Sequence, residues 1–237
     1  MLPPVVFILP ALNEAQAIAQ VLDHLKVKIA ALGLGAKILV VDNGSTDATS
    51  RVAAAHGATV IPEPRRGYGQ ACLTGITHLP PETQIVVFLD ADGSDDIENL
   101  PALLQPLFLS EADFVFGSRT LGVSEPGALT PQQRFGNWLA TRLLRVFIGA
   151  RYTDLGPFRA IRRSALDALR MRDTNFGWTI EMQIKAHRQG LRTLEVPVNY
   201  RRRVAGVSKV SANLRAGFLA GTKIIWTIVR LRFSPRG

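Results

Sequence analysis

Residues 84–94 read QIVVFLDADGS, an apolar run of strand length that stops at two carboxylates one residue apart. Because alternate residues of an extended chain point to the same side, Asp90 and Asp92 can face one small volume. Paired carboxylates suit Mg²⁺ or Mn²⁺, which prefer oxygen ligands and complete their shell with water and phosphate oxygens. The stretch therefore predicts a divalent-metal site at a strand end, and the alternative is a turn whose aspartates cap the next helix.

The sequence around this stretch alternates short apolar runs with longer helical patterns. Strands are expected at 4–9, 36–41, 58–61, 84–89 and 112–116. Helices are expected between them at 14–32, 46–56, 69–78 and 97–109. This order predicts an α/β fold with a doubly wound, mostly parallel sheet covered by helices on both faces. Ligands of such sheets bind beyond the carboxyl ends of the strands, where the sequence places Asn13, Glu14, Asp42, Asp90 and Asp92.

The second half of the chain is less regular. Its expected elements are helices at 131–148 and 178–189, a strand at 157–161, and extended segments over 191–200. A last helix, 211–231, is apolar around most of its circumference and carries a narrow basic stripe. With 237 residues, 47% of them hydrophobic, the chain can bury one substantial core, so a single domain over 1–237 is expected.

Basic residues exceed acidic ones by 28 to 19, and no acidic residue follows Glu195. The cations beyond that point are Arg201, Arg202, Arg203, Lys209, Arg215, Lys223, Arg230, Arg232 and Arg236. Such a cationic tail indicates phosphorylated substrates or an anionic membrane surface as partners, with plain solubility as the alternative. Nucleic acid is not expected, because no zinc-finger spacing, aromatic RNA-binding signature or basic-leucine pattern accompanies the charge.

The expected location follows from features the sequence lacks. No run approaches the roughly 20 apolar residues of a membrane-spanning helix. Residues 1–10 do not have the pattern of a signal peptide, and the single cysteine, Cys72, forms no internal disulfide. These observations predict a cytoplasmic protein.

Two neighbouring strand ends add a second polar cluster. VVDNGSTD (40–47) places Asp42 where it could accept the ring N–H of a uracil or guanine, although capping of the next helix explains the same pattern. PALNE (10–14) supplies another polar pair beside it. RRGYGQ (65–70) offers two cations and a flexible backbone for phosphates or ribose, and it matches neither a Walker A loop nor the dinucleotide fingerprint.

Taken together, PALNEA, VVDNGSTDAT, RRGYGQA and FLDADGS, in this order and at these intervals, resemble glycosyltransferase family 2 with a GT-A fold. Later stretches, GSR (117–119), DLGPFR (154–159) and RVAGVSK (203–209), resemble the dolichol- or polyprenyl-phosphate sugar synthase branch. The chain departs from the family pattern at two places. The frequent Asp-Asp pair before Gly-Ser is Asp42-Asn43 here, and Ser94 stands where a glutamine is often found.

The resemblance implies a role for each matching residue. The metal ligands would be Asp90, Asp92 and Ser94. The nucleotide would contact Pro10, Ala11, Asn13, Glu14, Asp42, Gly44, Arg66, Gly69, Asp90 and Ala91. The acceptor would contact Arg119, Arg134, Asp154, Arg203, Ser208 and Lys209. Asp92, Arg119 and Arg203 would act in catalysis, joined by Glu181 or Asp154 as general base if the acceptor is a hydroxyl.

By the same resemblance, the chain is expected to move a hexose from a UDP- or GDP-sugar to a polyprenyl or dolichyl phosphate, with inversion. Residues 1–117 would bind the nucleotide sugar and residues 118–237 the acceptor. A phosphate is already a nucleophile at neutral pH, so it needs cations to position it more than a base. The last helix would lie on the cytoplasmic face of a membrane, or else pack on the core or on a second copy in a homo-oligomer.

Other functions fit the same residues. One is a glycosyltransferase with a soluble phosphorylated or hydroxyl acceptor. Another is a nucleotidyltransferase, which would release pyrophosphate where a glycosyltransferase releases a nucleoside diphosphate. The last is a non-catalytic nucleotide-sugar-binding protein.

Overall fold

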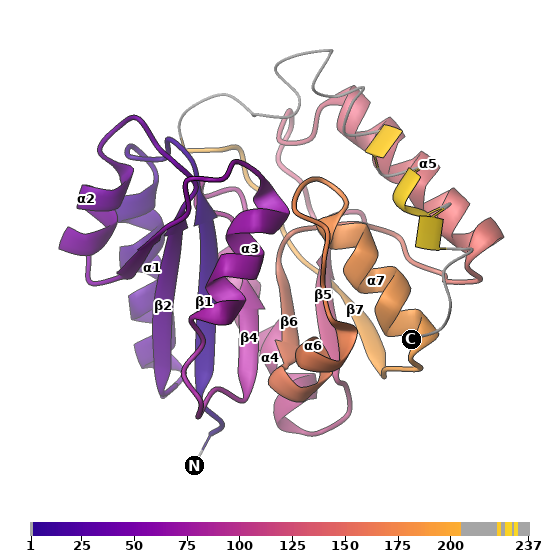
Figure 1. Cartoon of the computed structure of the whole chain (residues 1–237), viewed down its shortest axis with the longest axis horizontal. Helices are drawn as coiled ribbons and strands as arrows, with labels where there is room; N and C mark the ends of the chain where they lie inside the picture. The colour runs from indigo at the N-terminus through magenta and orange to yellow at the C-terminus, as the bar shows by residue number, and fades with distance from the viewer. Residues whose placement is uncertain (1, 205–221, 224–225, 229, 232–237) are drawn as a thin grey trace.

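The computed structural model describes residues 2–204, 222–223, 226–228 and 230–231. Within them, a seven-stranded sheet has the order β3-β2-β1-β4-β6-β5-β7 (Figure 1). The strands are β1 (Val5–Ala11), β2 (Ala36–Asp42), β3 (Thr59–Pro62), β4 (Ile85–Phe88), β5 (Phe114–Ser118), β6 (Arg159–Arg162) and β7 (Thr193–Pro197). β1 pairs in parallel with β2 and β4, β2 with β3, and β5 with β7, whereas β6 is antiparallel to both neighbours. The predicted mostly parallel sheet is confirmed.

Helices cover both faces of this sheet. They are α1 (Ile18–Ala31), α2 (Thr49–Ala55), α3 (Tyr68–Thr77), the 3₁₀ helix η1 (Ile97–Asn99), α4 (Leu100–Phe108), α5 (Pro131–Phe147), α6 (Arg163–Leu169) and α7 (Trp178–Arg188). Alternate residues of β1 enter two different cores: Phe7 and Leu9 belong to the buried cluster with residues of α1 and α4, whereas Ile8 belongs to the cluster with residues of α3. This two-sided burial explains why β1 and β4 are wholly apolar.

Most predicted elements agree with the structure to within a few residues, but α6 was not predicted. It is seven residues long, too short to show a helical repeat of apolar residues. Most of the helix expected at 211–231 lies outside the described residues. Of its described part, Ile228 and Leu231 pack in a buried cluster with Leu144 of α5 and Ile184 of α7. Among the described residues, no helix combines the length and hydropathy needed to cross a bilayer.

At Gly75, α3 packs closely against the sheet. A Cβ at this position would lie 2.6 Å from Ile8 Cγ2 and 3.2 Å from Val41 Cγ2, both buried branched side chains with little room to move. We therefore expect Gly75→Ala to lower the free energy of unfolding by about 1–3 kcal/mol in urea titrations. Gly136→Ala in α5 is the control, because nothing lies within 4 Å of its added methyl group. Equal stabilities of the two variants would contradict this account.

Candidate active site

A pocket of about 360 Å³ opens beyond the carboxyl ends of β1, β2 and β4. Its walls come from these strand ends, from the start of α3, from the loop before α7 and from the segment after β7. They are formed by Pro10, Ala11, Leu12, Glu14, Asn43, Arg66, Gly67, Tyr68, Ala71, Asp90, Ala91, Asp92, Asn175, Phe176 and Arg203. Six of the ten predicted nucleotide-binding residues are among them: Pro10, Ala11, Glu14, Arg66, Asp90 and Ala91. Asn13, Asp42, Gly44 and Gly69 are not.

The predicted metal pair meets in this pocket. Asp92 is 3% exposed, and its Oδ1 accepts hydrogen bonds from the backbone N and the Oγ of Ser94 at 2.8 and 2.5 Å. A guanidinium nitrogen of Arg203 lies 2.8 Å from the other oxygen, Oδ2. Asp90 Oδ1 is buried and has no hydrogen-bond partner. Ser94 thus orients Asp92, and one oxygen of Asp90 is left for a ligand.

Three carboxylates share this buried region. Burial and the adjacent Asp92 raise the pKa of Asp90 to about 7, against the opposing effect of Arg203. Burial and Asp90 also raise the pKa of Asp95, whose Oδ2 accepts the backbone N–H of Asp90 at 3.1 Å. Such crowding of negative charge at an unpaired oxygen suits a divalent cation. In the part of the chain that the structure describes, no three Asp, Glu, His or Cys side chains converge as ligands, so water and substrate oxygens would complete the shell.

Arg203 reaches the pocket because the chain after β7 runs beside residues 92–96. The backbone N–H of Val204 donates to the Asp92 carbonyl at 3.1 Å, and that of Arg201 donates to the Ser94 carbonyl at 2.8 Å. The Arg201 guanidinium also pairs with Asp96, which is 4% exposed. This ladder places Arg203 within 2.8 Å of Asp92 and 4.0 Å of Glu14. A predicted acceptor-binding residue therefore sits at the predicted metal site.

The two loops at the nucleotide side are joined by side-chain-to-backbone hydrogen bonds. Asn13 has a left-handed backbone (φ 53°), and its Oδ1 accepts the Thr46 N–H at 2.7 Å. Asp42 accepts the Ser45 N–H at 2.8 Å and the Ser50 hydroxyl. The oxygens of Asp42 are thus engaged with the turn before α2 and with the side chain of Ser50, and Asp42 lies outside the pocket lining. The carboxylate that accepts an N–H at the start of α2 is Asp47, which bonds the Thr49 N–H at 2.9 Å. Gly44 lies under the side chain of Arg66, with its Cβ position 3.5 Å from the Arg66 Nε.

Asn43 was not predicted as a site residue, although it lines the pocket and is 5% exposed. Its Nδ2 donates to the carbonyls of Glu63 and Arg65 at 3.1 and 2.7 Å, and its Oδ1 accepts the Gly67 N–H at 2.8 Å. An aspartate cannot donate to the two carbonyls, so the departure from Asp-Asp has a structural reason. Buried Glu63 also holds this loop, and its hydrogen bonds with Arg65 keep its pKa well below the usual range.

The glycines of RRGYGQ allow the backbone at the start of α3 to lie close to the backbone of the loop before α7. A Cβ on Gly67 would lie 2.1 Å from the Thr174 carbonyl oxygen, and one on Gly69 would lie 2.1 Å from that of Asp173. The Gln70 N–H donates to the Thr174 carbonyl at 2.8 Å. Gly69 therefore faces the loop that carries two pocket residues, Asn175 and Phe176, and its contact with the nucleotide stays a prediction.

Glu181, the candidate general base, lies outside the pocket lining and is 1% exposed. Its oxygens accept the backbone N–H groups of Arg172 and Asp173, the latter at 2.6 Å, and pair with Lys185 at 2.7 Å. Because Glu181 is buried and its oxygens are engaged, it is neither accessible as a proton-abstracting base nor solvated on the helix surface. Glu181 holds the loop before α7, whose next residues reach the pocket. Sequence could not show this, because the contact depends on how α7 meets that loop.

On the acceptor side, Arg119 and Asp154 form one unit. The Nε and Nη2 of Arg119 donate to the two Asp154 oxygens at 2.7 Å each, and the guanidinium lies 5.0 Å from the centre of the Tyr200 ring. Asp154 is 1% exposed and keeps the pKa of Arg119 above its usual value. Arg134, on α5, is exposed. Ser208 and Lys209 lie outside the described residues.

The fold and this pocket are those of a GT-A glycosyltransferase. The chain belongs to Glycosyl transferase family 2, whose model matches residues 6–170. It is 39% identical over 218 residues to an uncharacterized glycosyltransferase of Mycobacterium tuberculosis, covering 91% of this chain and 94% of that one. It is 32% identical to a dolichyl-phosphate hexose transferase of Haloferax volcanii, with 94% and 92% covered.

A solved structure has the same fold. Glucosyl-3-phosphoglycerate synthase from Mycobacterium tuberculosis, in complex with Mn²⁺, uridine diphosphate and phosphoglyceric acid, superposes with a TM-score of 0.76. The match has 25% sequence identity and covers 98% of this chain and 80% of that chain. The predicted GT-A fold and glycosyltransferase class are thereby confirmed.

The raised pKa values of Asp90 and Asp95 make stability depend on pH. Between about pH 4 and about pH 7 the folded protein binds more protons at these sites than the unfolded chain, whose aspartates titrate near 3.8. In metal-free buffer, this contribution to the free energy of unfolding is therefore lost as the pH rises through that range. We expect Asp90→Asn to become steadily more stable relative to the parent protein as urea titrations move from pH 4.5 to 8. A constant difference across that range would contradict the assignment.

The contacts of Glu181 with the loop before α7 predict the effect of replacing it. Glu181→Gln weakens the hold on the loop before α7, by an amount on the order of 1–3 kcal/mol, and should raise the dissociation constant for the nucleotide. Calorimetry on the protein and on Glu111→Gln, an exposed control, measures this effect. A general base would behave differently: kcat would fall with nucleotide affinity unchanged, and the pH–rate profile would lose its limb on the acidic side.

Proposed function

We propose that the enzyme transfers a hexose from a nucleoside diphosphate sugar to the phosphate of a polyprenyl or dolichyl carrier, with inversion at the anomeric carbon. The observation that carries the proposal is the pocket itself, in which Asp90 and Asp92 meet Arg203 beyond the parallel strands. Residues 1–117 bind the donor in this scheme, and residues 118–237 bind the acceptor. The enzyme would work in the cytoplasm, as a peripheral protein on the membrane.

The donor side fits a metal-bound diphosphate. Asp90 and Asp92 would hold Mg²⁺ or Mn²⁺. A bound cation would compensate the two buried carboxylates, one of which has an oxygen without a hydrogen-bond partner, and it would relieve the repulsion that raises the pKa of Asp90. When bound, the metal neutralises charge that grows on the leaving nucleoside diphosphate. Support comes from the solved relative, whose complex contains Mn²⁺ and uridine diphosphate. Asn43 lines the pocket just beyond β2, where the nucleoside would lie.

The acceptor side fits a phosphate better than a hydroxyl. Both candidate bases are engaged: Glu181 with backbone N–H groups and Lys185, and Asp154 with Arg119. Arg119 and Arg203 instead present positive charge, which positions a nucleophile that needs no deprotonation. Attack by a phosphate oxygen forms a bond to the anomeric carbon as the bond to the diphosphate oxygen breaks on the opposite side. The diphosphate leaves with the electron pair.

A soluble phosphorylated acceptor is the second candidate, because the solved relative contains phosphoglyceric acid. The dolichyl-phosphate hexose transferase favours the lipid carrier, since it matches almost the full length of both chains. Both acceptors offer a phosphate group to the same arginines. The other two alternatives, nucleotidyl transfer and non-catalytic binding, do not fit the glycosyltransferase family to which the chain belongs.

We expect Mn²⁺ and UDP or GDP together to raise the melting temperature of the protein, with one nucleotide giving the larger shift. Asp92→Asn should abolish the metal-dependent part of that shift, whereas Asp23→Asn, on the exposed side of α1, should keep it. With the matching sugar nucleotide, polyprenyl phosphate should yield nucleoside diphosphate and a glycosylated lipid. Transfer to 3-phosphoglycerate alone would establish the soluble acceptor, and no nucleotide binding with any divalent cation would end the proposal.

A further inference from the structure

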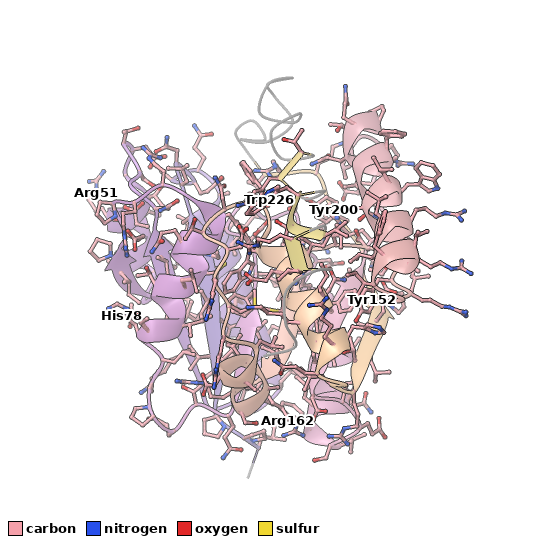
Figure 2. All side chains as sticks on the ribbon, turned by 45° about the vertical axis from the view of Figure 1, so that its right-hand side comes forward. Arg51, His78, Tyr152, Arg162, Tyr200 and Trp226 are labelled. Atoms are coloured by element: carbon pink, nitrogen blue, oxygen red, sulfur yellow. The ribbon has the colours of Figure 1, made fainter. Side chains whose placement is uncertain are left out.

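The outer face of α5 exposes large apolar side chains. Its inner face is buried against α7 through Ala140 and Leu144. The exposed fractions on the outer side are high: Phe135 62%, Trp138 52%, Val146 75% and Phe147 45%. In Figure 2 this helix lies at the right-hand edge of the molecule, and side chains project from it away from the rest of the protein.

These side chains are spaced for one side of a helix. Phe135, Trp138, Arg142 and Val146 follow one another at intervals of three, four and four residues, which places them on a single stripe. Their contacts agree, since the rings of Phe135 and Trp138 lie 5.8 Å apart and the Arg142 guanidinium lies 5.9 Å from the Trp138 ring. Aromatic rings and a cation are thus combined on one exposed surface, which we call the α5 outer face.

Charge around this face has a single sign. Between Glu125 and Asp154 the sequence has no acidic residue, and its arginines are Arg134, Arg142, Arg145 and Arg151. Tryptophan and phenylalanine beside arginine suit the headgroup region of a bilayer, where rings enter the acyl boundary and guanidinium groups meet lipid phosphates. Each such cation contributes about 1 kcal/mol next to an anionic surface.

We propose that the α5 outer face binds the surface of an anionic membrane. The face is joined rigidly to the acceptor side of the pocket: Asn137 of α5 donates to the Thr153 carbonyl and accepts the Leu155 N–H, both at 3.0 Å. These residues flank Asp154, the partner of Arg119. The proposal rests on the proposed function in one respect, namely that a lipid-linked phosphate would be the reason to hold the pocket at a membrane.

Vesicle co-sedimentation of the full chain tests this proposal. The protein should bind vesicles of phosphatidylcholine with phosphatidylglycerol at low salt, and bind pure phosphatidylcholine weakly. Arg142→Gln and Arg145→Gln should each lower the partition coefficient about fivefold, the equivalent of about 1 kcal/mol per cation. Phe135→Ser combined with Trp138→Ser should lower it at least as much. Arg51→Gln is the matched control, because Arg51 is exposed on α2, at the opposite edge of the molecule in Figure 2, and its binding should equal that of the parent.

Several results would overturn the proposal. The first is that the protein does not bind anionic vesicles, and the second is that the α5 variants bind them as well as the parent does. The third is that replacing Trp138 lowers the mass of the free protein in sedimentation velocity, because this would show that the face is a contact between copies. Transfer to a short, water-soluble polyprenyl phosphate keeps the two proposals apart, since the α5 variants should match the parent there. If the parent transfers to no acceptor yet binds vesicles through α5, the proposed function fails and this one stands.

Discussion

Repulsion among buried carboxylates at the end of β4 is the constraint on which the site depends. Asp90, Asp92 and Asp95 lie within six residues, and burial raises the pKa of the first and the third. Proteins keep such groups together only where a cation compensates them. In the structure that cation is Arg203, which is brought from the far end of the sequence by backbone hydrogen bonds to residues 92 and 94. The segment after β7 is therefore tied to the loop after β4 at this cluster of negative charge.

A second constraint is steric. The start of α3 and the loop before α7 approach so closely that Gly67 and Gly69 have no room for a side chain. Glu181 fixes that loop from behind through its backbone N–H groups. The wall formed by Asn175 and Phe176 is thus set by contacts that touch no ligand. Gly69 and Glu181 contribute to the shape of the pocket without lining it.

Local patterns predicted the fold and the centre of the site from sequence. Apolar runs that end in carboxylates gave the parallel strands and placed Asp90 and Asp92 correctly, because strand direction decides where a carboxyl end lies. What escaped prediction depends on long-range contacts. The pairing of Arg203 with Asp92, the hold of Asn43 on the loop after β3, and the buried role of Glu181 each join segments whose proximity no local repeat encodes. Asp42 was ambiguous in sequence, and its present hydrogen bonds go to Ser45 and Ser50.

Arg119 and Arg203, which the sequence predicted to bind the acceptor, are both held by carboxylates. Arg119 is held by Asp154 and Arg203 by Asp92, and both carboxylates are almost fully buried. Buried ion pairs add little net stability, because desolvation offsets most of the attraction. What they provide is direction. A guanidinium has five N–H donors, and the pairing of Arg119 with Asp154 through Nε and Nη2 fixes the plane in which its other donors point. Such fixed donors recognise a phosphate with little further loss of side-chain entropy. A flexible surface lysine would have to be ordered in each catalytic cycle, and this difference is the physical reason to place the phosphate between Arg119 and Arg203.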